Sequence, residues 1–216
     1  MLNMSLWRLL LLFGNFFSSG NGQCPKILSR EEWGARSPVE TPETIAGPLP
    51  FTVVHHGGSK QYCTTQEECT KMVRNYQDFH MDKRGWNDIG YNFVVGEDGN
   101  IYEGRGWDTM GAHAPTYNSR SVGICVIGDF SNRLPNEAAL NAVKDLIQCG
   151  VSTNKLKEGY KLIGHRQSAA SSTKCPGDAF YEEITQWSHW TPDASFDTEE
   201  EQQPEQKPEE IVEEED

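Results

Sequence analysis

Strand-type and helix-type segments alternate along this chain, and their order restricts the possible folds more strongly than any other feature of the sequence. Short runs of branched and aromatic residues predict strands at residues 51–56, 89–95, 100–103, 121–127 and 161–165. Helices are predicted at residues 65–83, 136–150 and 178–187. Because the second and third strands flank a Gly-Glu-Asp-Gly turn of hairpin type, the sheet must be mixed. We expect a single α/β domain with a central mixed β-sheet flanked by helices.

The first predicted helix has a clear start signal and an apolar face. Thr65 and Glu68 form a capping box at its first turn. Its apolar residues recur at helical spacing and are expected to face the core: Cys69, Met72, Val73, Tyr76 and Phe79. The second helix is expected to bury Leu140, Val143 and Ile147.

Neither end of the chain has the composition of a folded core. Residues 1–22 combine one early cation, a short apolar run and small residues, which is typical of a secretory signal peptide and too short for a membrane anchor. Residues 191–216 contain twelve Asp or Glu and one Lys, so we expect a disordered acidic tail. The expected domain therefore spans residues 23–190, in a secreted, extracellular protein.

The tail also accounts for most of the formal net charge of −13. The remaining chain is nearly neutral and lacks the basic face that a membrane-active protein would need. We expect no nucleic-acid partner and no stable membrane insertion after the signal peptide is cleaved. For the tail, a role in solubility is favoured over docking to a basic partner, and the sequence does not identify such a partner.

Six cysteines occur in a chain that is expected to be exported, so disulfides are permitted. Their connectivity does not follow from spacing, although Cys63 and Cys69 are close enough to pair locally. Cys125 lies in an apolar, strand-like run and is expected to be a buried free thiol. A disulfide between Cys125 and Cys175 is the alternative.

Three residues could form one metal site. His55 and His165 each stand where a predicted strand ends, and Cys175 follows a polar loop and precedes Pro-Gly. Two imidazoles and one thiolate would leave the fourth position of a zinc ion open, as in catalytic sites. The three residues form no compact metal-binding motif, so spacing alone does not distinguish such a site from unrelated side chains.

Seven short segments, in this order, add a family resemblance. They are SREEWGAR at 29–36, VVHH at 53–56, WNDIGYNF at 86–93, GEDG at 96–99, YEGRGW at 102–107, GAHA at 111–114 and GHRQ at 164–167. Together they closely resemble the peptidoglycan recognition protein domain, specifically its short secreted members. That domain is similar to phage-type lysozymes that are amidases, and the resemblance covers about residues 24–190. It implies the type 2 amidase fold.

In this family, enzymatic members bind zinc through positions that match His55, His165 and Cys175. Non-enzymatic members usually have serine in place of the cysteine. The resemblance therefore implies a zinc-dependent N-acetylmuramoyl-L-alanine amidase of innate immunity, with bacterial peptidoglycan and its muramyl peptides as partners. Such an enzyme hydrolyses the lactyl-amide bond between muramic acid and the stem peptide. The main alternative is a non-catalytic peptidoglycan-binding receptor.

The resemblance also implies two catalytic residues. Tyr91 matches a tyrosine beside the reacting water, and Thr173 matches a hydroxyl residue two positions before the cysteine ligand. The loop between His165 and Cys175 is two residues longer than is usual in the family, which leaves open whether Thr173 or Ser171 meets the substrate.

Substrate-binding positions and disulfides are likewise implied by the resemblance. A Gly-Trp pair with a following arginine, here Gly85, Trp86 and Arg105, goes with peptidoglycan of the diaminopimelate type. The other implied groove positions, besides Tyr91, are His56, His80, Arg84, His113 and Ala114. The implied disulfides are Cys63–Cys69 and Cys24–Cys149, which leave Cys175 free to bind a metal.

Overall fold

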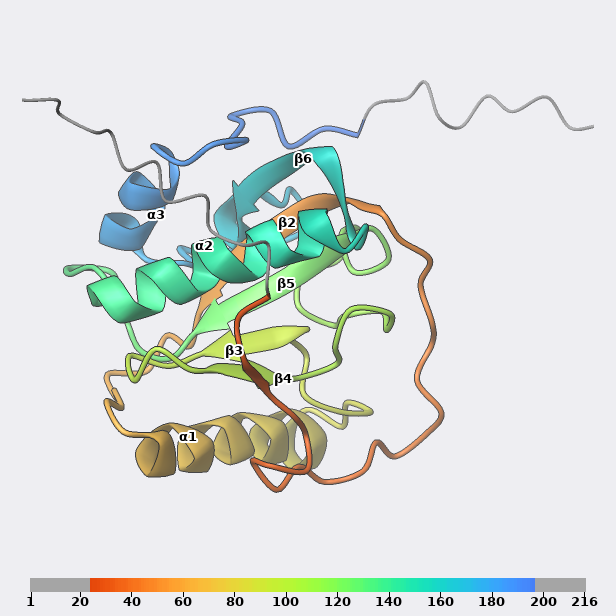
Figure 1. Cartoon of the computed structure of the whole chain (residues 1–216), viewed down its shortest axis with the longest axis vertical. Coiled ribbons are helices and arrows are strands. Elements are labelled where there is room, and N and C mark those ends of the chain that lie inside the picture. The colour runs from red at the N-terminus through yellow and green to blue at the C-terminus, as the bar shows by residue number, and fades with distance from the viewer. Residues whose placement is uncertain (1–23, 197–216) are drawn as a thin grey trace, which may run out of the picture.

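Six strands form one mixed sheet with the order β1-β4-β3-β5-β2-β6 (Figure 1). The computed structural model describes residues 24–196; the predicted signal peptide and residues 197–216 lie outside this part of the chain. The strands are β1 (Ile27–Leu28), β2 (Leu49–His56), β3 (Phe93–Val95), β4 (Ile101–Glu103), β5 (Ser121–Val126) and β6 (Leu156–Gly164). The predicted hairpin of β3 and β4 is the antiparallel pair, and the other pairs are parallel, so the mixed α/β fold is confirmed.

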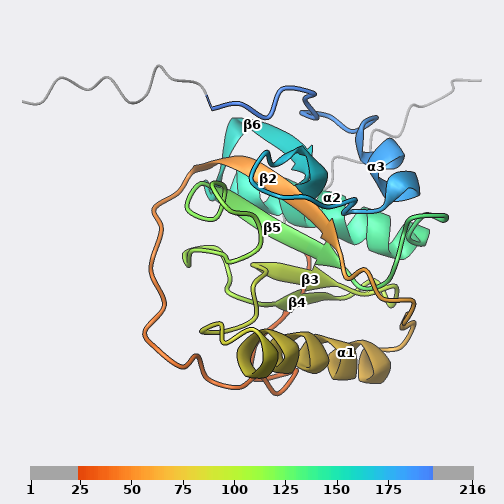
Figure 2. The ribbon, with the colours of Figure 1, turned by 180° about the vertical axis from the view of Figure 1, so that it is seen from behind.

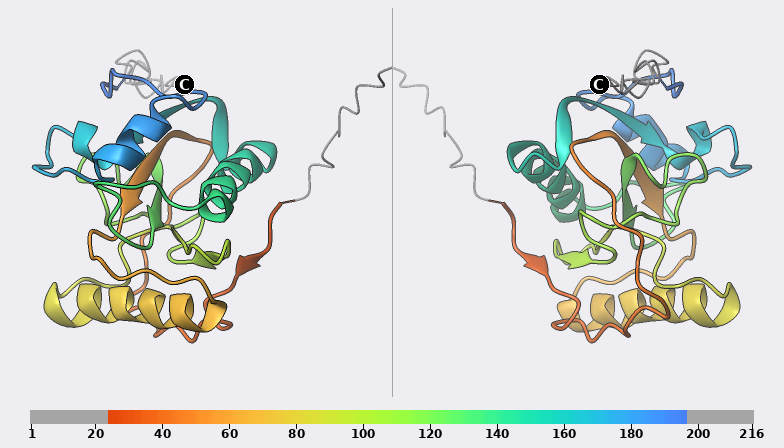
Figure 3. Two further views of the ribbon diagram at one scale, coloured as in Figure 1. Left: turned by 90° about the vertical axis from the view of Figure 1, so that its left-hand side faces the viewer. Right: turned by 90° about the vertical axis from the view of Figure 1, so that its right-hand side faces the viewer.

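Helices cover both faces of this sheet (Figures 1 and 2). They are α1 (Gln66–Asp78), α2 (Glu137–Ser152) and α3 (Asp178–Ile184), with a π-helical turn η1 (Phe79–Lys83) after α1 and a 3-10 turn η2 (His165–Gln167) after β6. The side views of Figure 3 show the yellow α1 and the teal α2 well apart from each other. Among residues 24–196, no helix has the length and apolar character needed to cross a membrane.

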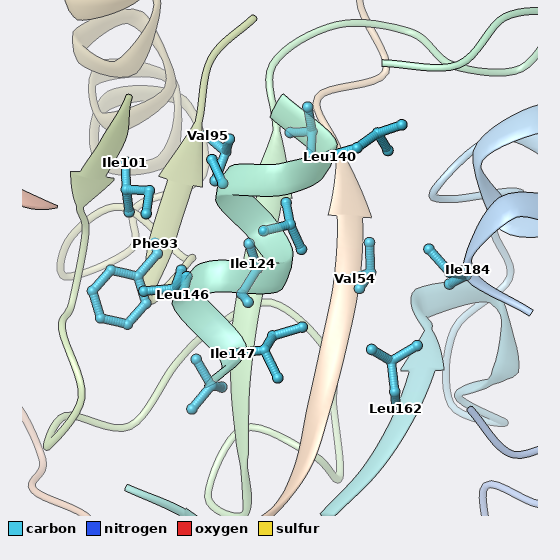
Figure 4. Close-up of a cluster of buried hydrophobic side chains, with 14 of the residues drawn as sticks. Val54, Phe93, Val95, Ile101, Ile124, Leu140, Leu146, Ile147, Leu162 and Ile184 are labelled. Atoms are coloured by element: carbon cyan, nitrogen blue, oxygen red, sulfur yellow. The ribbon is translucent and has the colours of Figure 1, made fainter. Parts of the chain in front are cut away.

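The largest core cluster lies between the sheet and the helices α2 and α3 (Figure 4). Val54, Ile124 and Leu162 of three neighbouring strands pack there against Leu146 of α2 and Ile184 of α3. Side chains alternate between the faces of a strand, so His55, next to Val54, points to the face on which α1 lies. The core on one face therefore determines which residues of β2 are available to a site on the other.

The helix starts agree with the sequence. At α1, the hydroxyl of Thr65 accepts the backbone N–H of Glu68 at 3.3 Å, while the Glu68 carboxylate accepts the N–H of Thr64 at 3.2 Å. The cap thus resembles a capping box, with the returning bond displaced by one residue. At α2, the Asn136 side chain accepts the N–H of Ala139 at 2.9 Å. The predicted buried residues of α2 are confirmed as buried.

The end of the first helix differs from the prediction. The α-helix ends at Asp78, and residues 79–83 form a wider π-helical turn that changes the phase of the side chains. Phe79, expected in the core, is 48% exposed, whereas His80 and Met81 are buried, because the buried face of α1 passes through Val73 and Gln77. Two residues of this turn, Phe79 and His80, form part of the wall of the cleft described below.

The strand predicted at residues 89–95 begins only at Phe93. The preceding carbonyls have other partners: Ile89 O accepts from Nε of Arg105 at 2.7 Å, and Gly90 O accepts from the N–H of Ala112 at 2.8 Å. Other ends moved as well, since β6 starts at Leu156 rather than at residue 161, and α3 ends at Ile184 rather than at 187. The short strand β1 was not predicted because two residues show no periodicity.

The described part of the chain includes the first six residues of the predicted tail. The Phe196 ring lies 5.8 Å from that of Phe51 and 5.1 Å from that of Tyr117. The guanidinium of Arg120 lies 4.1 Å from the Phe196 ring. Residues 191–196 therefore pack against the domain, through Ala194 and Phe196 and through backbone bonds of Thr191.

Both disulfides implied by the resemblance are present. Cys24–Cys149 ties the start of the described chain to α2, and Cys63–Cys69 closes a small loop at the start of α1. Cys125 is a buried free thiol, as predicted. Cys175 is also free and buried, so the alternative disulfide between these two residues is absent from the structure.

Candidate metal centre and its cleft

The carboxyl ends of two neighbouring parallel strands bring the two candidate histidine ligands together. His55 is the penultimate residue of β2, and His165 directly follows β6. The strands are in register at Val54 and Gly164, and the two imidazole rings lie 4.5 Å apart. In open α/β sheets, ligand sites commonly lie at the carboxyl ends of the strands. Strand pairing thus brings together two histidines that are 110 residues apart in the sequence.

Cys175 completes the cluster from the loop that follows η2. Its Sγ lies 3.7 Å from Nδ1 of His55 and accepts the backbone N–H of His56 at 3.3 Å. The backbone N–H of Arg166 donates to the Cys175 carbonyl at 2.8 Å, which joins the cysteine to the turn that carries His165. The ligand atoms of His55, His165 and Cys175 lie within 4.8 Å of one another, the one group of this kind within residues 24–196.

This donor set suits a tetrahedral zinc ion. Zinc accepts imidazole nitrogen and thiolate sulfur, and its bond lengths place such a nitrogen and sulfur about 3.6 Å apart. The observed 3.7 Å between His55 Nδ1 and Cys175 Sγ agrees with that spacing. Three protein ligands leave one position open, as in catalytic rather than structural sites. The residues therefore fit the ion on both chemistry and distance.

Burial sets the protonation of these groups. It lowers the pKa of His55 well below its ordinary value, helped by the nearby His113 and His165, and it lowers the pKa of His165 to about 4. Both imidazoles are therefore neutral, the form that binds metals. Burial also raises the pKa of the Cys175 thiol to about 12, opposed by the His56 N–H and by Arg166. In such surroundings the thiolate needs a cation beside it.

The cluster lies in a cleft of about 620 Å³ between the carboxyl ends of β2 and β6 and the end of α1. Tyr91 forms part of one wall, and its ring lies 5.3 Å from that of His55. His80 stacks on Trp86 at 4.7 Å, and the Arg84 guanidinium lies 5.6 Å from the Trp86 ring. Burial raises the pKa of Tyr91 well above its ordinary value, so its hydroxyl keeps its proton and remains a donor.

Most of the other residues predicted for the site also line this cleft. His56 and Thr173 do so, and the Thr173 hydroxyl accepts the N–H of Cys175 at 3.1 Å. Gly85 is not among the lining residues; it has a positive φ of 66°, a conformation that favours glycine, at the turn between Arg84 and Trp86, which both line the cleft. His113 borders the cleft floor but is only 7% exposed.

Two predicted groove residues have other surroundings. Ala114 is fully buried and packs against Phe51, Val53, Tyr117 and Ile163. Arg105 lines a separate small recess beside Asp88. Its Nε and one terminal nitrogen donate to the carbonyls of Ile89 and Met110, at 2.7 and 2.8 Å. Within the described residues, its other terminal nitrogen makes no hydrogen bond.

Sequence reasoning missed two residues that line the cleft, and it missed one contact of Ser171, a residue that it had named. The exposed Phe79 lies on the rim of the cleft. Tyr76, assigned only to the core, also lines it, and its hydroxyl fills the space that a side chain at Gly57 would need, since a Cβ there would lie 1.8 Å from it. Ser171 bonds to His165. The one signal of these features in the sequence was the glycine at position 57, which leaves room for the Tyr76 hydroxyl.

We expect His80 to make the protein less stable in acid. Burial lowers its pKa to about 4, with Arg84 and Arg105 acting in the same direction and Asp88 against them. The unfolded chain binds this proton near pH 6.5, so the stability that depends on neutral His80 is complete above that pH and is lost towards pH 4. The His80→Asn variant keeps an acceptor for the Gly90 N–H and does not titrate.

The measurement is urea unfolding of metal-free wild type and His80→Asn between pH 7.5 and 4.5. Wild type should be the more stable at pH 7.5, because the variant lacks the ring that stacks on Trp86. The difference should shift in favour of the variant by about 2 kcal/mol at pH 4.5. Parallel pH profiles would show that His80 does not carry this pH dependence.

The chain is similar in sequence to known amidases and peptidoglycan recognition proteins. The profile of the N-acetylmuramoyl-L-alanine amidase family matches residues 46–178. Peptidoglycan-recognition protein LB of Drosophila melanogaster is 47% identical over 166 residues, which cover 77% of this chain and 70% of that protein. An N-acetylmuramoyl-L-alanine amidase of Mus musculus is 45% identical over 78% of this chain, but that match covers only 32% of the mouse protein.

A solved structure agrees at the level of the fold. It is that of peptidoglycan recognition protein LE in complex with tracheal cytotoxin, a monomeric peptidoglycan of the diaminopimelic acid type. The two structures share a TM-score of 0.74 and 42% sequence identity, over 76% of this chain and 95% of the other.

Proposed function

Because the chain belongs to the peptidoglycan recognition protein family, with the type 2 amidase fold, we propose that it is a zinc-dependent N-acetylmuramoyl-L-alanine amidase. Its substrate is bacterial peptidoglycan, and the bond it hydrolyses is the lactyl-amide bond between muramic acid and the stem peptide. The observation that carries this proposal is the convergence of His55, His165 and Cys175 at one end of a cleft. A protein that only binds peptidoglycan has no need of an open metal site.

His55, His165 and Cys175 would hold the zinc ion. When bound, zinc lowers the pKa of water to about 7 and polarises a carbonyl oxygen, which is the chemistry that amide hydrolysis requires. The His56 N–H that points at Cys175 Sγ stabilises the negative charge of the thiolate ligand. The buried positions of His55 and Cys175 keep these ligands rigid and away from bulk water.

Tyr91 and Thr173 would act on the amide itself. The protonated phenol of Tyr91, beside His55, is placed to donate a hydrogen bond to the oxyanion that forms as the carbonyl is attacked. The Thr173 oxygen already accepts the Cys175 N–H, so its hydroxyl hydrogen remains free to donate to the substrate.

We further propose a preference for diaminopimelate over lysine at the third position of the stem peptide. The two residues differ by one carboxylate, which an arginine can recognise through charge-assisted hydrogen bonds. Arg105 has one terminal nitrogen without a hydrogen bond among the described residues, Trp86 lines the cleft, and Gly85 forms the turn before Trp86. The related LE protein was solved with a ligand of the diaminopimelic acid type.

The predicted signal peptide and the two disulfides support secretion, and the family supports a role in antibacterial innate immunity. The exported enzyme would meet peptidoglycan outside the cell. His56, His80 and Arg84, which line the cleft, are proposed as groove residues for the muramyl peptide. The buried Ala114 would contribute only through its backbone.

Release of free stem peptide from purified peptidoglycan tests the proposal. Wild type is assayed on diaminopimelate-type and lysine-type walls as isolated, after chelation, and after zinc is returned. We expect release that chelation stops and zinc restores, faster on the diaminopimelate type. If zinc-loaded protein sediments with the wall but releases no peptide, the protein is a receptor and not an amidase.

A further inference from the structure

Both candidate histidine ligands have their second ring nitrogen occupied by another side chain. Nε2 of His55 lies 3.0 Å from Nδ1 of His113, and Nε2 of His165 lies 3.0 Å from Oγ of Ser171. The ring of His113 meets that of His55 edge-on, at 83° and 4.9 Å. Each ligand is therefore held at the end opposite to the one that could face a metal.

These bonds determine which nitrogen a metal would use. Nδ1 of His55 is the atom that faces Cys175 Sγ, and Nδ1 is also the nitrogen of His165 that Ser171 leaves free. A neutral imidazole that binds metal through Nδ1 carries its proton on Nε2. His55 then donates to His113, and His165 donates to Ser171, the arrangement that fixes the tautomer and ring orientation of metal ligands.

The residues around His113 fit closely against its ring. A Cβ at Gly111 or at Gly123 would lie 2.4 or 2.3 Å from Cδ2 of His113, so only glycine fits at either position. The Asn118 side chain accepts the N–H groups of both His113 and Ala114, at 2.8 and 2.9 Å. The ring is thus fixed beneath His55 and has little surface left for contact with a substrate.

Ser171 reaches His165 from a turn that is itself bonded to the domain. Its backbone N–H donates to the Ser168 carbonyl at 2.9 Å, and the Ser168 hydroxyl donates to the Pro115 carbonyl at 3.3 Å. This turn lies in the segment that is longer than is usual in the family. The Ser171 hydroxyl is thus held next to the second ligand.

We propose that His113 and Ser171 are positioning residues that orient His55 and His165 for the metal, and that His113 is not a substrate contact. The proposal rests on the zinc site of the proposed function. Removing the acceptor for a ligating histidine typically lowers metal affinity 10- to 100-fold. Nothing in the geometry requires these residues to touch the substrate.

Zinc affinity, measured by competition with a chromogenic chelator, tests the proposal without reference to activity. Ser171→Ala and His113→Leu should each weaken zinc binding about 10- to 100-fold. His113→Asn places an amide oxygen near the position of Nδ1 and should restore affinity to within a few-fold of wild type. His80→Asn is the control. It changes another buried histidine of the cleft, one that contacts none of the three ligands, and this variant should bind zinc like wild type.

A second readout separates positioning from substrate contact. Binding of a soluble muramyl peptide to the metal-free proteins should be the same for wild type, His113→Leu and His113→Asn. Lost peptide binding with zinc affinity intact would make His113 a groove residue and overturn the proposal, as would unchanged zinc affinity in both Ser171→Ala and His113→Leu. Wild type that binds no zinc would instead overturn the proposed function. Should His113→Leu fail to fold, Ser171→Ala and His113→Asn decide the matter.

Discussion

Cys175→Ser is expected to lose zinc and to release stem peptide at least about 1,000-fold more slowly than wild type. The variant replaces the single anionic ligand of the cluster by a neutral hydroxyl, leaving two imidazoles. Metal-ion catalysis contributes several kcal/mol to the transition state, and each 1.4 kcal/mol is a factor of ten in rate. Serine is also smaller than cysteine, so the loop should keep its fold.

The measurements are zinc content after dialysis, the rate of peptide release, and sedimentation with insoluble peptidoglycan. Wall binding should persist, because most of the cleft does not involve Cys175. Cys125→Ala is the matched control, since Cys125 is the other free, buried thiol and is not a member of the ligand cluster. It should retain zinc and wall binding; these are the two quantities compared, because the Cys125 thiol contacts Tyr91. A Cys175→Ser protein that still binds zinc and cuts at the wild-type rate would show that the ligand set is wrong.

Tyr91→Phe is expected to lower kcat by about 100- to 1,000-fold, the usual effect of removing one oxyanion donor. Zinc content and affinity for the muramyl peptide should stay as in wild type. The variant keeps the ring that packs beside His55 and His80 and removes only the hydroxyl. A hydrogen bond that strengthens only in the transition state affects kcat and not ground-state binding.

Steady-state kinetics on a soluble muramyl peptide, together with zinc analysis, provide the test. Tyr160→Phe removes a hydroxyl from a tyrosine of β6 that stacks on His189 and does not line the cleft, so it should leave kcat unchanged. A Tyr91→Phe variant with normal kcat and a raised KM would identify Tyr91 as a binding residue only. Loss of zinc in this variant would mean that the tyrosine supports the ligands and not the reaction.

Most of the fold was predictable because its signals are local. The Gly-Glu-Asp-Gly turn, the caps at Thr65 and Asn136, and the periodicity of α2 all depend on residues that are close in the sequence. The errors occurred where distant contacts override local preference. Residues 89–92 have strand composition, yet their carbonyls bond to Arg105 and Ala112, and Phe79 is exposed at the junction of α1 with the π-helical turn.

The candidate site divides in the same way. The sequence by itself determined the chemical types: two histidines at strand ends, a cysteine before Pro-Gly, and a tyrosine between glycine and asparagine. Only the tertiary structure decided that β2 and β6 are parallel neighbours, which brings His55 and His165 within reach of Cys175. It alone placed His113 and Ser171 behind the two ligands and Arg105 beside a separate recess. The reason is physical: residue type sets what an atom can bind, but strand pairing and packing across the whole chain set which atoms meet.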